Sequence, residues 1–227
     1  RFPQAVVARM DADTMAERGA HERVLAAFRK KHIDVLIGTQ MIAKGLDFPD
    51  VTLVGVVSAD TGLFVPDYRA AERTFQLLYQ VAGRAGRAEK PGIVVFQTFC
   101  PDNYAVAAAS KLDYDAFVQQ ELLFRRQTGY PPFSRLIRVL AEARQEAEAR
   151  TLLQSAIAPA RGLQDVDLLG PAPAVLARVK DRWRWHMLAK CYNPAAFARA
   201  MQALGTVEDR ASRTCRITLD VDPGSLL

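Results

Sequence analysis

The chain has 227 residues and a net charge of +5, and its 50% hydrophobic and 24% charged residues are typical of a soluble globular protein. It contains no apolar run of the ~18 residues that a membrane helix requires and no signal-peptide pattern, so we expect a cytoplasmic protein without a membrane partner. Three widely spaced cysteines (Cys100, Cys191 and Cys215) form no Cys-x-x-Cys pair, which argues against a zinc site in these residues and fits a reducing compartment.

The first part of the chain alternates between strand-like and helical segments. Short apolar runs predict strands over Ala5–Arg9, Asp34–Ile37, Thr52–Val57 and Gly92–Phe99. Helical spacing predicts helices over Glu22–Phe28, Ala70–Val81 and Asp113–Arg126. Continuous apolar strands that alternate with helices are typical of a parallel sheet with helices packed on it. We therefore predict an α/β domain over residues 1–128, ending at Thr128–Pro132, where two prolines follow a glycine.

Residues 129–227 are predicted to form a second, smaller α+β domain. Its expected strands are Arg135–Ala141, Val166–Leu169, Val175–Val179, Trp183–Cys191 and Cys215–Val221. Its expected helices are Glu142–Ala160 and Pro194–Leu204, with Pro194 in the first turn. The third and fourth strands would form a hairpin that turns at Lys180–Arg182. This order fits a small split βαβ, ferredoxin-like sandwich.

A phosphate-binding pattern follows the helix predicted over Ala70–Val81. Gln80 and Arg84 are four residues apart, and Arg84 and Arg87 are three apart, so on one helix the three side chains share a face. A planar guanidinium suits a phosphate and can stabilise charge on a transferred phosphoryl group, as arginine fingers do. A basic helix end would explain the arginines but neither Gln80 nor the glycines between them. We therefore predict half of an ATP site here.

A second pattern, the loop Gly38–Pro49, follows the strand predicted over Asp34–Ile37. Ligands of open α/β sheets bind outside the carboxyl ends of the strands, so this loop is suitably placed for a nucleotide. Thr39 offers a hydroxyl to a phosphate, and Lys44 either meets a phosphate or stays in solvent. Asp47 could accept a ribose hydroxyl, and a turn residue ahead of a proline explains it equally well.

The two patterns resemble motifs V and VI of superfamily 2 helicases. The sequence between the two motifs narrows the resemblance to the PriA family, the bacterial primosomal replication-restart helicases. The segments that carry this closer resemblance are Asp60–Phe64, Pro66–Arg73 and Gln76-Leu77. Near the end of the chain, Gly170–Pro173, Arg182–Trp185 and Asp220–Pro223 also resemble that family, so the resemblance covers essentially the whole chain. It implies a second RecA-like helicase lobe, with a parallel sheet and helices on both faces, followed by the small α+β domain.

The resemblance also implies roles for individual residues. Gln80, Arg84 and Arg87 would reach the γ-phosphate of ATP, and Gly45 and Asp47 would contact the nucleotide. The residues implied for DNA are Thr39, Gln40 and Lys44. The implied activity is that of an ATP-dependent 3′ to 5′ DNA helicase that recognises stalled or forked DNA and assembles a primosome. Its partners would be forked and single-stranded DNA and other primosome proteins, and it would be associated with the nucleoid.

Several parts of the family pattern do not occur in these residues. The chain starts without Met and has no Gly-x-Gly-Lys-Thr-type phosphate loop, no Asp-Glu-x-His-type metal site and no cysteine-rich zinc insertion. We therefore expect a fragment of a longer protein, in which a first lobe holds most of ATP and Mg²⁺ and the insertion holds zinc. The fragment alone is expected to be inactive.

A basic and aromatic tract, Arg178–Lys190, contains five cations and one acid. The alternation in Arg182-Trp183-Arg184-Trp185 would place both Trp on one side of a strand and both Arg on the other. The Trp side either packs in the core, which the alternation favours, or stacks on unpaired bases. Both arginines could contact phosphates in either case. The resemblance adds the acidic, hydrophobic C-terminal tail of single-stranded DNA-binding protein as a partner for Arg182 with an aromatic neighbour.

The remaining polar residues of the second domain have structural interpretations. His186 is expected to be an ordinary strand residue, and Asp220 and Asp222 are expected to form a cap or a salt bridge rather than a metal site. Two other functions stay open: a recruitment module for DNA and proteins with relic motor motifs, or another superfamily 2 motor. An intact phosphate loop upstream would favour a motor, and residues 129–227 argue against another superfamily 2 motor.

Overall fold

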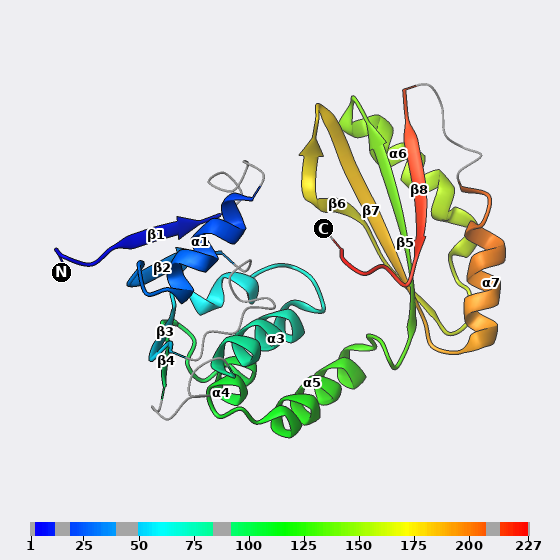
Figure 1. Cartoon of the computed structure of the whole chain (residues 1–227). Helices are drawn as coiled ribbons and strands as arrows, with labels where there is room; N and C mark the ends of the chain where they lie inside the picture. Colours follow the sequence, from blue (N-terminus) through cyan, green and yellow to red (C-terminus); the bar gives the residue numbers. More distant parts are fainter. Residues whose placement is uncertain (1–2, 12–18, 40–49, 84–91, 208–213, 227) are drawn as a thin grey trace. The chain divides into compact units, whose positions relative to one another are not determined.

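The computed structural model describes residues 3–11, 19–39, 50–83, 92–207 and 214–226. The chain forms two compact units, which we describe separately (Figure 1). Unit 1 consists of Arg1–Leu63 and Ala71–Phe117, and unit 2 consists of Phe64–Ala70 and Val118–Leu227. These two units do not coincide with the domains predicted from the sequence, 1–128 and 129–227. The domain boundary after residue 128 stays a prediction.

The strands of unit 1 pair in parallel, as the sequence predicts. β1 (Val7–Met10) pairs with β2 (Val35–Gly38), and β3 (Leu53–Val56) pairs with β4 (Ile93–Phe96). In the described residues these pairs form two separate sheets. The continuous apolar pattern predicted burial on both faces, but one set of alternate side chains is exposed: Val7, Val35, Ile37, Leu53, Ile93 and Val95.

The helices of unit 1 bury apolar stripes. They are α1 (Ala20–Arg29), α3 (Ala70–Ala82) and α4 (Tyr104–Ser110). Helix α5 spans Tyr114–Thr128, and only its first turn, up to Phe117, belongs to unit 1. Phe75 of α3 stacks on Phe117 of α5, with 3.9 Å between ring centroids and 2° between ring planes. The sequence did not predict α4, which has seven residues and is therefore too short for a clear helical period. Its start is marked by Asn103, whose side chain accepts a hydrogen bond from the backbone of Ala105.

Gly62 lies in close contact with α3. Gly62 ends the short 3₁₀ helix η1 (Ala59–Gly62), and a Cβ atom there would overlap Oγ1 of the buried Thr74. We expect Gly62→Ala to lower the free energy of unfolding by about 1–3 kcal/mol, the usual cost of overpacking. Thr74→Ala removes the overlapping atom and should restore most of that loss. Urea denaturation followed by circular dichroism measures both effects, and a Gly62→Ala protein as stable as wild type would contradict this close approach.

Unit 2 is built on a four-stranded antiparallel sheet with strand order β6-β7-β5-β8. Its elements are β5 (Arg135–Ala143), α6 (Glu146–Ile157), η2 (Ala158–Ala160), β6 (Val166–Val179), β7 (Arg182–Cys191), α7 (Pro194–Leu204) and β8 (Arg216–Val221). The order β-α-β-β-α-β is the split βαβ, ferredoxin-like arrangement that the sequence predicts. Helices α6 and α7 cover one face of the sheet and enclose the main hydrophobic core with it (Figure 1).

The two strands predicted at Val166–Leu169 and Val175–Val179 are one strand, β6, in the structure. The sequence suggested a break because Gly170 and two prolines lie between them. The strand instead passes these residues with two register shifts against β7, between Leu169 and Ala172 and between Pro173 and Arg178. Proline is tolerated at such irregularities, where no ladder hydrogen bond is needed from its nitrogen.

Two predicted boundaries in unit 2 were also wrong. Glu142 and Ala143 were assigned to a helix, but both belong to β5, where Ala143 is buried and pairs with Trp183. Alanine is a strong helix former, and the sheet overrides that preference here. The hairpin turn contains only Lys180 and Asp181, both with positive φ, as in a two-residue type I′ turn, so Arg182 belongs to β7.

Candidate nucleotide and nucleic-acid sites

Gln80 lies near the C-terminal end of α3 and is half-buried. The helix is held in place by the buried side chains of Phe75, Leu78 and Val81. The backbone N–H of Gly83 donates to the carbonyl oxygen of Tyr79 at 3.0 Å, so helical hydrogen bonding continues to Gly83. Gln80 is therefore carried by a rigid element, and its amide N–H can donate to a phosphate oxygen, while its N–H and C=O groups can respectively donate to and accept from a water.

The other predicted contacts to nucleotide, and two of those to DNA, lie outside the described residues. They are Gln40, Lys44, Gly45, Asp47, Arg84 and Arg87. The shared face predicted for Gln80 with the two arginines thus stays a prediction. A single amide carries no positive charge, so Gln80 by itself does not fit a triphosphate with Mg²⁺. The positive charge that this site requires would have to come from Arg84 and Arg87.

Thr39 directly follows β2 and is exposed. Its neighbour Gly38 pairs with Met10, the last residue of β1, so the carboxyl ends of the two parallel strands meet at one edge. Asp11, which follows β1, is buried at this edge and forms an ion pair with Arg9. This is the edge at which open α/β sheets bind ligands, so Thr39 lies at the kind of position that motivated its assignment. Its contact with DNA stays a prediction.

Asp60 is a structurally important residue that the sequence reasoning did not single out. Its buried carboxylate accepts hydrogen bonds from the Thr98 hydroxyl and from the backbone N–H of Phe99, the latter at 2.7 Å. These hydrogen bonds, that of Thr98 first, lower the pKa of Asp60. They join η1, which follows β3, to the chain just after β4. The available signal was an acidic residue shortly after the apolar strand β3.

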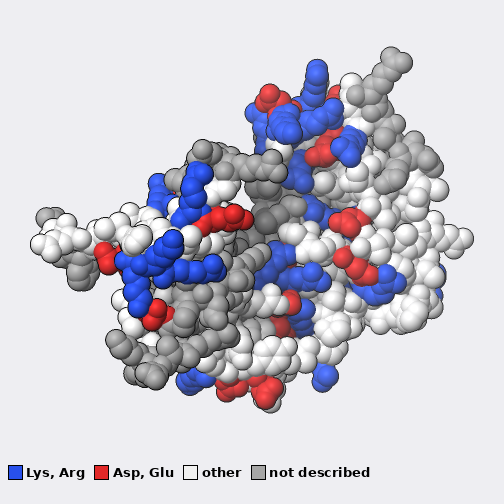
Figure 2. Space-filling view, in the orientation of Figure 1, with Lys and Arg blue, Asp and Glu red and all other residues white. Residues whose placement is uncertain are grey.

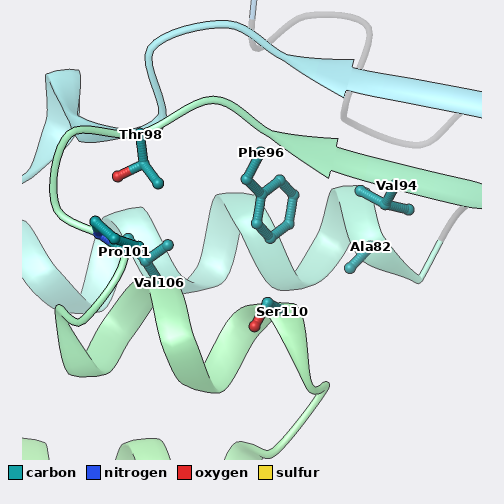
Figure 3. Close-up of a pocket in the computed structure, with 7 residues that line it drawn as sticks. All are labelled: Ala82, Val94, Phe96, Thr98, Pro101, Val106 and Ser110. Atoms are coloured by element: carbon teal, nitrogen blue, oxygen red, sulfur yellow. The ribbon is translucent and has the colours of Figure 1, made fainter.

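A small pocket lies beside the end of α3 (Figure 3). Its volume is about 240 Å³. The residues that line it come from α3, β4, the following turn and α4: Ala82, Val94, Phe96, Thr98, Pro101, Val106 and Ser110. None of these side chains is charged, and both hydroxyl groups already bond within the protein. The pocket is therefore unsuited to a phosphate, and we do not assign the nucleotide to it.

The structure places the two tryptophans on the helix-covered side of the C-terminal sheet. Trp185 packs against the core enclosed by α6 and α7, and the guanidinium of Arg150 on α6 lies 5.6 Å from its ring centroid. Trp183 lies near the start of β7, with Arg178 5.5 Å from its ring. This packing favours the core interpretation for Trp185. Base stacking by Trp183 and Trp185 was the alternative interpretation and stays a prediction.

The opposite face of the sheet is not covered by α6 or α7 and carries several basic groups. Arg184 forms an ion pair with Glu142 at 3.3 Å and donates to the carbonyl oxygen of Leu176 at 3.4 Å. Arg138, on the neighbouring strand β5, lies on the same face and is buried. Burial, and then the charges of Arg138 and Arg184, lower the pKa of His186. These groups form a cationic cluster whose arginine charges are partly balanced by Glu142.

Charge is mixed rather than uniform over the visible surface. Figure 2 shows Lys and Arg side chains interspersed with Asp and Glu side chains. Arg182, at the start of β7, donates to the carbonyl oxygen of Thr214 at 3.1 Å. Arg182 and Arg184 thus each have at least one contact within the protein. A phosphate would have to share or replace these contacts.

Asp222 forms a salt bridge, one of the two structural roles that the sequence predicts for Asp220 and Asp222. Its carboxylate accepts from Arg135 at 2.6 Å and from the backbone N–H of Leu136 at 3.2 Å. Across the described part of the chain, no three His, Cys, Asp or Glu side chains are grouped to hold a metal ion. Nor does any helix of that part have the length and apolar character needed to cross a membrane.

Comparison with known proteins identifies two domains, one after the other in the sequence. Residues 4–89 match the helicase conserved C-terminal domain, and residues 126–224 match the primosomal protein N C-terminal domain. The replication restart protein PriA of Bacillus subtilis is 48% identical over 191 residues, which cover 83% of this chain and 24% of that protein. The chain belongs to the PriA family. It corresponds to a C-terminal part of the proteins of that family and contains a helicase lobe and a primosomal C-terminal domain.

Other members of the PriA family match almost the full chain. The replication restart protein PriA of Synechocystis is 39% identical over 227 residues, covering 99% of this chain and 27% of its own length. That of Haemophilus influenzae is 38% identical over 228 residues, covering 99% of this chain and 31% of its own length. The chain thus spans about a quarter to a third of the length of the PriA proteins that it matches.

Proposed function

We propose that this chain is part of an ATP-dependent DNA helicase that recognises stalled or forked DNA and restarts replication by assembling a primosome. The observation that carries the proposal is the order of two domains on one chain, a helicase C-terminal domain over residues 4–89 and a primosomal C-terminal domain over 126–224. A helicase lobe alone is compatible with many motors. The primosomal domain restricts the motor to replication restart.

In this function the end of α3 supplies the second half of the ATP site. Arg84 and Arg87 neutralise charge on the γ-phosphate during its transfer, and Gln80 orients a phosphate oxygen or the attacking water. Gly45 and Asp47 contact the nucleotide. A first lobe outside these residues supplies the phosphate cradle and Mg²⁺, and a cysteine-rich insertion outside them holds zinc. The chain alone therefore does not hydrolyse ATP.

DNA contacts come from both domains. In the helicase lobe, Thr39, Gln40 and Lys44 meet the DNA backbone at the carboxyl end of β2. In the C-terminal domain, Arg182 and Arg184 contact phosphates from β7. Arg182 beside Trp183 also provides a cation and an aromatic ring for the acidic, hydrophobic C-terminal tail of single-stranded DNA-binding protein. Other primosome proteins are further partners, and the protein acts in the cytoplasm on the bacterial nucleoid.

Strand displacement tests this function. We expect the full-length protein, given ATP, to unwind a forked duplex, and to unwind a partial duplex with a 3′ single-stranded tail in preference to one with a 5′ tail. A fluorophore and a quencher at the duplex end report unwinding, with a non-hydrolysable ATP analogue as the control. Preference for the 5′ tail would overturn the proposed polarity. Equal unwinding with the analogue would overturn an ATP-driven motor.

The second candidate function is a recruitment module that binds DNA and primosome proteins without motor activity. The mixed charge and internal contacts of Arg182 and Arg184 are compatible with such a role. Both functions require DNA binding, so a DNA affinity does not separate them. They differ in ATP hydrolysis, which only the motor performs.

A further inference from the structure

The segment Phe64–Ala70 belongs to unit 2 although it lies between the two helicase motifs in the sequence. It contains the turn that leads into α3, and α3 carries Gln80. The last described residues of the chain, Asp222–Leu226, leave strand β8 and contact this same turn. A short tail of the C-terminal domain is therefore joined to the start of a motor helix.

Asp67 is the centre of this contact. Its side chain is buried, and one carboxylate oxygen accepts from the backbone N–H of Arg69 at 2.9 Å, within the turn before α3. The other oxygen accepts from the Ser225 hydroxyl at 3.1 Å and from the backbone N–H of Leu226 at 3.0 Å. The carbonyl oxygen of Asp67 accepts from Ala70, the first residue of α3, at 2.9 Å. One residue thus bonds both to the tail and to the helix start.

Apolar packing supports the hydrogen bonds. Leu226 is buried in a cluster with Leu136 of β5 and Leu188 of β7, against which Tyr68 and Tyr130 pack. The rings of Tyr68 and Tyr130 are stacked, with 5.0 Å between centroids and 3° between planes. Within unit 2, Asp67 and its neighbour Tyr68 therefore contact the tail and the sheet by polar and by apolar groups.

The contact extends to the cationic face of the sheet. Arg138, which lies on that face beside Arg184 and His186, donates to the carbonyl oxygen of Ser225 at 3.3 Å. The Ser225 hydroxyl in turn donates to Asp67. Two hydrogen bonds through Ser225 therefore link Arg138, on the sheet face that also carries Arg184, to the turn that starts α3.

We propose that Asp67 is a positioning residue that couples DNA binding by the C-terminal domain to the ATP site through α3. Helix α3 has 13 residues and is therefore about 20 Å long, and a rigid helix carries a displacement of its first turn to Gln80 near its other end. The inference rests on the proposed motor function. It assigns no chemistry to Asp67, which acts only by holding the helix start in the position that the tail sets.

The test compares ATP turnover of the full-length protein with and without saturating forked DNA. Asp67→Asn keeps the shape of the side chain but removes its charge and half of its acceptor capacity, and Leu226→Ala weakens the same contact from the tail. We expect both variants to lower the stimulation by DNA at least about fivefold, the lower end of typical coupling between sites. Turnover without DNA and DNA affinity should stay unchanged, which a general loss of structure would not allow. Because Leu226→Ala removes a buried side chain and lowers stability, all variants are assayed at a temperature at which circular dichroism shows them folded.

Matched controls are Asp102→Asn and Leu176→Ala, which alter an exposed carboxylate and an exposed leucine of the same chain. The double variant Asp67→Asn with Ser225→Ala should be no worse than Asp67→Asn, because both changes act on one contact. Ser225→Ala also tests the contact by itself should Asp67→Asn fail to fold. Full stimulation in Leu226→Ala and in either Asp67→Asn or Ser225→Ala would overturn the coupling. If forked DNA does not stimulate ATP turnover of the wild-type protein, the proposed function is overturned instead.

Discussion

Replacing Arg84 by alanine in the full-length protein should reduce ATP turnover by about 10³–10⁵-fold, the range known for arginine fingers. The same loss is expected for Arg87→Ala. The reason is that each guanidinium would stabilise negative charge that develops on the transferred phosphoryl group, which a neutral side chain cannot do. Turnover at saturating ATP and forked DNA measures the effect, and DNA affinity should stay close to that of the wild type.

Two further variants separate this role from a general effect of charge. Arg84→Lys keeps a positive charge but loses the planar fork that binds two oxygens, so most of the activity should still be lost. Arg73→Ala removes an exposed arginine from the same helix, α3, and should leave turnover unchanged. Wild-type turnover in both Arg84→Ala and Arg87→Ala would contradict the assignment of these residues to the ATP site.

The second large effect is expected at Trp185. Because Trp185 packs against the core between the sheet and its helices, Trp185→Ala should lower the free energy of unfolding by about 3 kcal/mol, the low end for removing a core aromatic ring. Chemical denaturation followed by far-ultraviolet circular dichroism measures this loss. Single-stranded DNA affinity, measured where the variant is folded, should not change.

Trp185→Phe is the matched control. Within the described residues no acceptor meets the indole N–H of Trp185, so phenylalanine loses ring area but no hydrogen bond and should destabilise much less. A base-stacking role predicts the opposite pattern for Trp185→Ala. Stability would then be unchanged, while DNA affinity would fall by the ~1–3 kcal/mol that one stacked base contributes. That result would contradict the core interpretation.

The sequence predicted the parts of the fold that depend on local periodicity. Apolar runs located β1 to β4, and their parallel pairing followed from the helices between them. Pro194 and the apolar spacing after it located α7, which begins at that residue. The long strand β6 was not predicted, because Gly170 and the prolines that follow it are typical of a turn. The chain stays extended there because it pairs with β7, a contact that the local sequence does not show. Helix α4 was too short to show a period.

The candidate sites divide in the same way. Residues in compact motifs, such as Gln80 and Thr39, could be proposed from their spacing and from the family resemblance, and their roles stay predictions. Asp60, Asp67 and Arg138 could not, because their partners lie far away in the sequence. The carboxylate of Asp60 bonds to Thr98, 38 residues later, and that of Asp67 bonds to Leu226, 159 residues later. In the sequence, a single charged residue without a nearby partner is indistinguishable from an ordinary exposed charged residue. Only the folded structure shows the partner that it bonds to.

ATP hydrolysis by the full-length protein, measured over a titration of forked DNA, tests the central claim most directly. We predict that turnover rises with DNA to a plateau, and that the 227-residue chain alone shows none under the same conditions, because it supplies only one half of the ATP site. A full-length protein that binds the fork but hydrolyses no ATP at any DNA concentration would contradict a motor, and would support the recruitment module instead.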